Sequence, residues 1–156
     1  MTPPLALVPL CSLDLTLGEY QIVGEGPAGF RVVAPVVDGT VTGDRLRGDV
    51  LPEAMADWIV VNGPVATVDV RGTVRTHDDA LVHVTYRGRI DMTDGPGTAP
   101  IYVAPTFEAG DERYAWLNLV QAVGVGRLDG ERLHYDWFEV AVPDAVLLGA
   151  ATGDRT

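Results

Sequence analysis

The chain has 156 residues, of which 47% are apolar, and this is enough to form the core of one domain of ordinary size. Its formal net charge is −11 and it contains no lysine, which argues against nucleic acid and anionic membranes as partners, because both require a basic surface. Eighteen glycines and eleven prolines, spread along the whole chain, are typical of a domain built from many β-strands.

The first ten residues are apolar but include no basic residue, and Arg31 is the first cationic side chain. This pattern predicts a first strand and not a secretory signal. Because the sequence has no run of eighteen apolar residues, we expect no membrane-spanning helix and a cytoplasmic protein. Cys11 is the single cysteine and cannot form an internal disulfide.

Alternating apolar and polar residues predict a succession of strands along the chain. We expect strands at residues 5–17, 31–43, 45–50, 58–61, 66–76, 80–90, 101–108, 117–125 and 133–141. The expected helices are short, at residues 53–57 and 143–150. Long strands in sequence order favour pairing between chain neighbours, and closing the sheet removes its exposed edges. The fold class predicted is therefore all-β: a single antiparallel β-barrel domain over residues 1–156, with its core at about 5–142 and a tail at 143–156.

Residues 66–89 predict a β-hairpin, because apolar or glycine residues alternate with polar residues along both halves. Its polar face has two interpretations: the wet outer face of an antiparallel sheet, or a polar lining inside a barrel. A shift of one residue in register would exchange the two faces. The loop at residues 91–98 is expected to lie over the barrel mouth. The polar face carries Asp69, Arg71, Arg75, His83 and Arg87.

Several segments together resemble a small bacterial and fungal family catalogued as domain of unknown function 3237. The resemblance rests on residues 46–52 (LRGDVLP), Ala56-Asp57-Trp58, Tyr86-Arg87-Gly88 and the run from Pro105 to Asn118. It covers about residues 10–140 and implies a compact β-barrel, without a settled activity. The stretch between Arg89 and Ile101 is shorter than in many relatives, so we expect a more open mouth.

Three polar residues are catalytic candidates. Asp57 adjoins Trp58, and an aromatic wall would desolvate the carboxylate and raise its pKa, which would suit it to acid or base catalysis. The alternative is that Asp57 caps a turn or forms an ion pair with an arginine. Arg47 could hold an enolate or carboxylate, or form a salt bridge at the rim. Asn118 could orient a carbonyl, or tie two strands together.

The substrate-binding candidates are aromatic residues and part of the polar hairpin face. The aromatic residues could form a ligand wall or simply fill the core. The scattered histidines share no ligand spacing, so we expect no metal and no cofactor. The candidates are Trp58, Tyr86, Tyr102, Tyr114, Trp116, Asp69, Arg71 and His83.

Three functions agree with these features. The favoured one is a cofactor-independent enzyme that binds a largely apolar small molecule, such as a polyketide-like intermediate, and catalyses a cyclisation, isomerisation or lyase-like step. The second is a non-catalytic carrier or sensor of a small molecule. The third is a structural or oligomeric interaction domain whose aromatic residues are core. A homodimer is compatible with all three.

Overall fold

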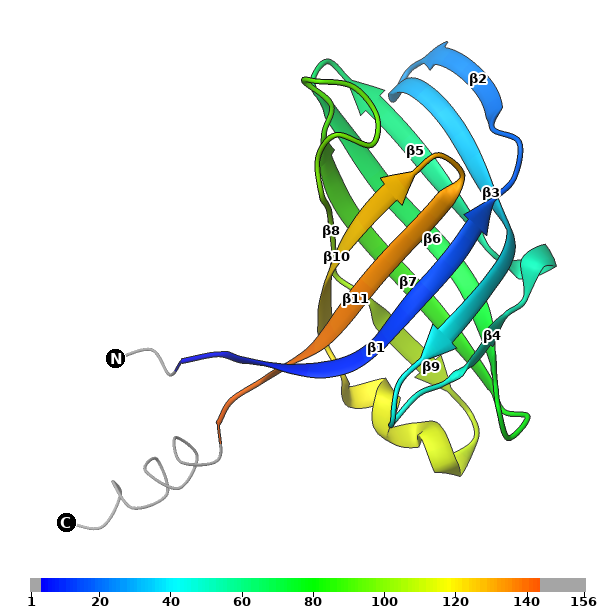
Figure 1. The fold of residues 1–156 in the computed structure, drawn as a ribbon, viewed down its shortest axis with the longest axis vertical. Helices are drawn as coiled ribbons and strands as arrows, with labels where there is room; N and C mark the ends of the chain where they lie inside the picture. The colour runs from blue at the N-terminus through cyan, green and yellow to red at the C-terminus, as the bar shows by residue number, and fades with distance from the viewer. Residues whose placement is uncertain (1–3, 144–156) are drawn as a thin grey trace.

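The computed structural model describes residues 4–143, which form a closed eight-stranded antiparallel β-barrel (Figure 1). The predicted fold class is confirmed. The predicted helix at 143–150 and the tail at 143–156 lie, beyond Pro143, outside the described residues. The strands are β1 (Ala6–Leu17), β2 (Gln21–Gly26), β3 (Gly29–Thr42), β4 (Gly48–Val50), β5 (Ala56–Asn62), β6 (Val65–Thr76), β7 (Leu81–Asp91), β8 (Ile101–Val103), β9 (Thr106–Ala109), β10 (Ala122–Asp129) and β11 (Arg132–Ala141).

The strands pair in a closed ring. Around the barrel the order is β3, β1, β11, β10, β8, β7, β6 and β5, and β5 pairs with β3 to complete the ring. Two of these antiparallel pairings are long. β6 and β7 pair from Val65↔Asp91 to Arg75↔Leu81, as the predicted hairpin requires. The first and last strands, β1 and β11, pair from Ala6↔Ala141 to Thr16↔Arg132. Three short strands supplement this cylinder: β2 extends β3, β4 lies between β3 and β6, and β9 continues along β7 beyond β8.

The alternation in β6 shows which side chains fill the barrel. Val68, Val70 and Val74 are buried, whereas Arg71 and Arg75 at alternate positions are exposed. Since successive side chains of a strand point to opposite faces, the polar face of the hairpin lies outside the barrel. The structure thus agrees with the wet outer face and not with a polar lining.

The structure differs from the sequence prediction at several elements. The expected strand at 101–108, for example, is divided into β8 and β9. β2 was not predicted, because nearly all its residues are exposed and produce no alternation of burial. A 3₁₀ helix, η2 (Glu112–Leu119), lies where the strand at 117–125 was expected to begin, so the predicted start is wrong, whereas β10 confirms the strand from Ala122 onward. The Asp111 side chain accepts a hydrogen bond from the Arg113 N–H and caps η2, and this local bond competes with an extended chain.

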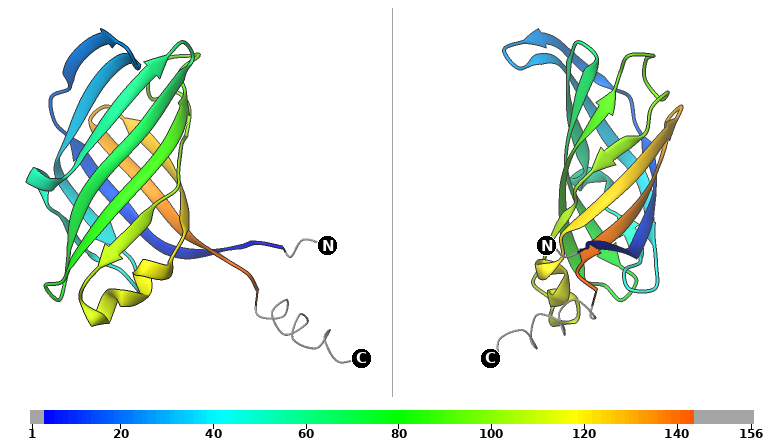
Figure 2. Two further views of the ribbon diagram at one scale, coloured as in Figure 1. Left: turned by 180° about the vertical axis from the view of Figure 1, so that it is seen from behind. Right: turned by 90° about the vertical axis from the view of Figure 1, so that its left-hand side faces the viewer.

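Two helical elements lie outside the sheet. The shorter one, η1 (Pro52–Ala54), overlaps the expected helix at 53–57, but Asp57 belongs to β5. η2 lies at one end of the barrel and the β2–β3 hairpin at the other, as the views from behind and from the side show (Figure 2). No helix among residues 4–143 has the length and apolar character needed to cross a bilayer.

Candidate functional site

An apolar vestibule opens at the end of the barrel that carries the β2–β3 hairpin. Its volume is about 260 Å³. Phe30 and Val32 of β3 line one side, and Met92 and Pro96 of the loop after β7 line another. As predicted from the sequence, the segment at 91–98 contributes to the mouth of the barrel (Figure 1). The vestibule has the character of a small-molecule site, which is concave and mainly apolar.

A smaller chamber of about 50 Å³ lies deeper in the barrel. The two spaces share five lining residues, so they adjoin each other and these residues form the boundary between them. The chamber is lined in addition by Asp57, Tyr86 and Tyr135. The shared residues are Tyr20, Ile59, Ile90, Ile101 and Leu128.

Asp57 faces the chamber because it shares the inner face of β5 with Ile59, whereas Trp58 lies on the outer face. The ladder between β5 and β6 skips Trp58 and Ile59. At this gap the Asp69 N–H donates a hydrogen bond of 3.0 Å to Oδ1 of Asp57. The guanidinium of Arg31 donates one of 3.0 Å to the carbonyl of Trp58. Side chains thus replace two ladder bonds and fix the Asp57 carboxyl at the barrel wall.

Burial raises the pKa of Asp57 from 3.8 to about 7. The hydrogen bond from the Asp69 N–H lowers the pKa by a smaller amount, and the charge of Asp69 raises it further. The sequence predicted the direction of this pKa shift correctly, but the cause that it gave, desolvation by Trp58, is wrong. Trp58 is 39% exposed and its ring lies on the outer surface, 5.6 Å from the Arg71 guanidinium. The apolar barrel interior, not the neighbouring indole, desolvates the carboxyl.

Two buried tyrosines accompany Asp57 at the inner end of the cavity. Their rings are edge to face, with centroids 5.6 Å apart. Burial raises the pKa of both phenols above the ordinary range, and the charge of Asp57 adds to this effect. Tyr86 and Tyr135 therefore stay protonated and can act as hydrogen-bond donors.

The Trp137 indole packs against these tyrosines and lines neither space. Its ring centroid lies 5.2 Å from that of Tyr86 and 5.9 Å from that of Phe107. Glycines on β10 make room for the rings: a Cβ at Gly124 would collide with Trp137, and one at Gly126 with Tyr135.

Sequence reasoning missed Tyr20 and Tyr135 as site residues. A signal for Tyr135 was present, because Leu133, Tyr135 and Trp137 alternate along β11 and share its buried face. Tyr20 lies between β1 and β2, in a segment that showed no pattern.

The other two catalytic candidates lie near the opposite end of the barrel. Arg47 is exposed in the segment before β4, and its carbonyl accepts a hydrogen bond from the His77 N–H. The Asn118 side chain bonds both the N–H and the carbonyl of Ala109, and so ties η2 to β9. The structure therefore does not bring Arg47 or Asn118 together with Asp57.

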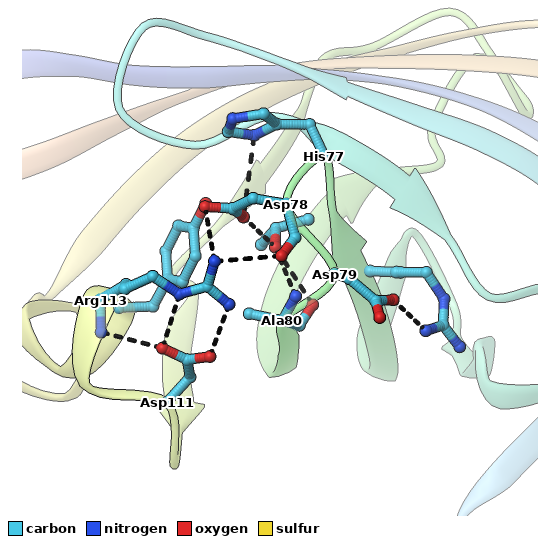
Figure 3. A network of polar contacts seen from close by, with 9 residues as sticks. His77, Asp78, Asp79, Ala80, Asp111 and Arg113 are labelled. Carbon is cyan, nitrogen blue, oxygen red and sulfur yellow. Dashed lines mark hydrogen bonds and ion pairs between the residues drawn. The ribbon is translucent and has the colours of Figure 1, made fainter.

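A polar network fixes η2 against the turn between β6 and β7 (Figure 3). The Asp78 carboxylate accepts hydrogen bonds of 2.6 Å from Tyr114 and 2.7 Å from Thr76, and lies 3.1 Å from the Arg113 guanidinium. Arg113 also forms two bonds to Asp111. These contacts secure η2 at the end of the barrel opposite the vestibule.

The remaining binding candidates are distributed between the outer face and this closed end. Tyr114 donates to Asp78, and the Trp116 ring lies 5.2 Å from the Arg45 guanidinium near η2. Tyr102 is 62% exposed. Of the eight binding candidates, only Tyr86 lines the cavity. The residues on the outer faces of their strands are Trp58, Asp69, Arg71, His83 and Tyr102.

No group of three or more His, Cys, Asp or Glu residues within the described part of the chain is arranged to hold a metal ion. The three histidines lie apart: His77 in the β6–β7 turn, His83 on β7 and His134 on β11. His134 instead contacts Asp14 at 2.8 Å and Asp136 at 3.1 Å on the outer surface.

Proteins similar to this one are mostly of unknown function. The UPF0311 protein RPA1785 of Rhodopseudomonas palustris is 25% identical over 152 residues, covering 90% of this chain and 99% of its own length. A hydroalkoxylation enzyme, phnH of Penicillium herquei, is 28% identical over 123 residues, covering 79% and 74% respectively.

Solved structures share the barrel. A β-barrel-like protein from Acinetobacter baumannii superposes with a TM-score of 0.83 at 27% identity, over 90% of this chain and 99% of that one. An enzyme from Penicillium herquei superposes with a TM-score of 0.66 at 25% identity, over 89% and 96%. A family model described as protein of unknown function (DUF3237) matches residues 5–140. The resemblance inferred from the sequence is confirmed, and the chain belongs to the DUF3237 family.

Proposed function

We propose that the protein is an enzyme that binds a largely apolar small molecule in the barrel and catalyses a cyclisation or isomerisation by proton transfer through Asp57. The observation that carries this proposal is a single carboxyl group with a pKa of about 7 at the inner end of an apolar cavity. A group whose pKa is close to the working pH is effective both as an acid and as a base.

The chemistry that fits is the addition of a hydroxyl group across a carbon–carbon double bond of the same molecule. Protonated Asp57 gives its proton to one alkene carbon while the hydroxyl oxygen bonds to the other. The hydroxyl proton then returns to the Asp57 carboxylate. The product is an isomer of the substrate, and neither an oxidant nor a reductant is consumed. The similarity to a hydroalkoxylation enzyme supports this reaction class.

Tyr86 and Tyr135 take the role that the sequence analysis gave to Arg47 and Asn118. Their phenols lie at the chamber with Asp57 and stay protonated. Each can donate a hydrogen bond to a substrate oxygen that gains negative charge in the transition state. The surrounding apolar wall holds the flexible substrate in a reactive conformation.

A carrier or sensor is the second candidate, because the apolar vestibule can bind a ligand without any chemistry. The two functions differ in their dependence on Asp57. A carrier should tolerate Asp57→Asn, which keeps the size of the side chain and an acceptor for the Asp69 N–H. An enzyme that uses the carboxyl proton should not.

The test compares metabolite extract of the source organism incubated with wild-type protein, Asp57→Asn and Trp58→Phe. Trp58 is the control because its ring lies outside the barrel, beside the candidate residue in sequence. We expect an ion that changes retention time at constant mass, with turnover, in the wild type and Trp58→Phe but not in Asp57→Asn. Depletion of an ion in equal stoichiometric amount by all three proteins would instead establish a carrier and refute the role of Asp57.

A further inference from the structure

The division of the cavity restricts the shape of its ligand. The vestibule measures about 260 Å³, whereas the chamber beside Asp57 measures about 50 Å³. The chamber has space for only a few non-hydrogen atoms, since one water molecule needs about 10–15 Å³ of such space. The bulk of a ligand must therefore remain in the vestibule, and only a narrow group can reach the carboxyl.

The boundary between the two spaces is built from aliphatic residues and Tyr20. Four separate strands contribute to it, through Ile59 of β5, Ile90 of β7, Ile101 of β8 and Leu128 of β10. Ile101 is 5% exposed and packs in the core. A ring held by several strands resists widening, because packed interiors transmit strain instead of yielding.

The charges of the cavity restrict the ligand further. Asp57 is its single Asp or Glu, and the lining of both spaces contains no Arg or His. A ligand carboxylate or phosphate at this depth would be desolvated beside a carboxyl group, with no cation to pair with it. The exposed residues next to the lining carry both signs, with Glu19 and Asp91 acidic and Arg89 and Arg127 basic. The cavity lining itself therefore disfavours an anionic group on the part of the ligand that enters it.

We propose that the two spaces are connected and that the substrate is an uncharged molecule with a broad apolar body, which occupies the vestibule, and a slim arm, which carries the reacting group past the shared boundary residues to Asp57. This inference rests on the proposed function and adds the class of substrate to it. The chemical consequence is that only a group at the end of the arm reacts.

Three probes test the charge and the shape separately. 4-Phenylbutan-1-ol has a slim arm that ends in a hydroxyl, 5-phenylpentanoate has the same arm with a carboxylate, and 2-naphthol has a broad body without an arm. At pH 7.5 we expect calorimetry to show that the alcohol binds at least about tenfold more tightly than the carboxylate. In Asp57→Asn the difference in affinity between the alcohol and the carboxylate should narrow, because an uncharged amide replaces the carboxyl beside the arm.

The variant Ala34→Leu tests the shape. Ala34 is 1% exposed, pairs with Asp57 across β3 and β5, and lines the chamber but not the vestibule. We expect Ala34→Leu to weaken binding of the alcohol at least about fivefold by filling the chamber, and to change 2-naphthol binding less than about twofold. Retained 2-naphthol binding also shows that the variant is folded. Val36→Ile, at a second chamber residue, gives a milder change if Ala34→Leu does not fold.

The outcomes separate this inference from the proposed function. If the carboxylate binds as tightly as the alcohol, or if both filling variants leave alcohol binding unchanged, the inferred substrate class is wrong while the apolar site stands. If none of the three probes binds the wild type, the proposed function fails together with this inference.

Discussion

Asp57 should make the protein less stable as the pH rises from about 4 to about 7. The pKa of Asp57 is 3.8 in the unfolded chain, the ordinary value for an aspartate, and about 7 in the folded protein. Below 3.8 the carboxyl is protonated in both states, so it has no effect on the pH dependence. Between the two values the unfolded chain releases a proton that the folded chain retains, and stability falls with rising pH. Above about 7 the effect is complete and constant.

The pKa difference sets the size of this effect. At about 1.36 kcal/mol per pKa unit, the shift from 3.8 to about 7 corresponds to about 4 kcal/mol of lost stability at alkaline pH. Asp57→Asn removes the titrating group, while its amide oxygen can still accept the hydrogen bond from the Asp69 N–H. The variant should therefore become the more stable protein at alkaline pH, by an amount that approaches this value.

Urea unfolding of the wild type and Asp57→Asn at a series of pH values measures the difference directly. The difference in free energy of unfolding should be constant below pH 4, rise in favour of the variant up to about pH 7, and then stay constant. The side-chain carbonyl resonance of Asp57 in an NMR titration gives an independent value for the pKa. A difference that does not vary with pH, or a resonance that titrates near 4, would refute the argument that the barrel interior desolvates this carboxyl.

Three further predictions concern the residues around the cavity and at its closed end. Tyr86→Phe and Tyr135→Phe should each lower turnover of the identified substrate about a hundredfold while the aromatic packing is kept, and unchanged turnover would contradict their role as donors. Gly124→Ala should destabilise the protein by about 1–3 kcal/mol in thermal unfolding, because the new Cβ meets the Trp137 ring. Gly110→Ala is the control, because the surroundings of Gly110 are open. Hydrogen bonds from Tyr114 and Thr76 hold the pKa of Asp78 at about 2, so Asp78→Asn should lower the free energy of unfolding at neutral pH. The free energies of unfolding of wild type and variant should converge as the pH falls from about 4 toward 2. A constant difference across that range would contradict the Asp78 argument.

The sequence by itself determined the strands and the direction of most side chains in them. The alternation in β6 and β7 predicted both the hairpin and its apolar face, because a strand places successive residues on opposite sides whatever its neighbours are. The even spread of glycine and proline indicated many turns. The sequence also identified Asp57 as a candidate acid or base, and its raised pKa agrees with that prediction.

Only the tertiary structure decided which residues meet. Asp57 and Asn118 were both catalytic candidates in the sequence, yet one lines the cavity and the other ties η2 to β9. Tyr135 reaches Asp57 because β11 pairs with β1 and β10, far along the barrel wall from β5. Side-chain direction depends on the local period of the chain, whereas proximity across a barrel depends on strand order, register and closure, which are properties of the whole sheet.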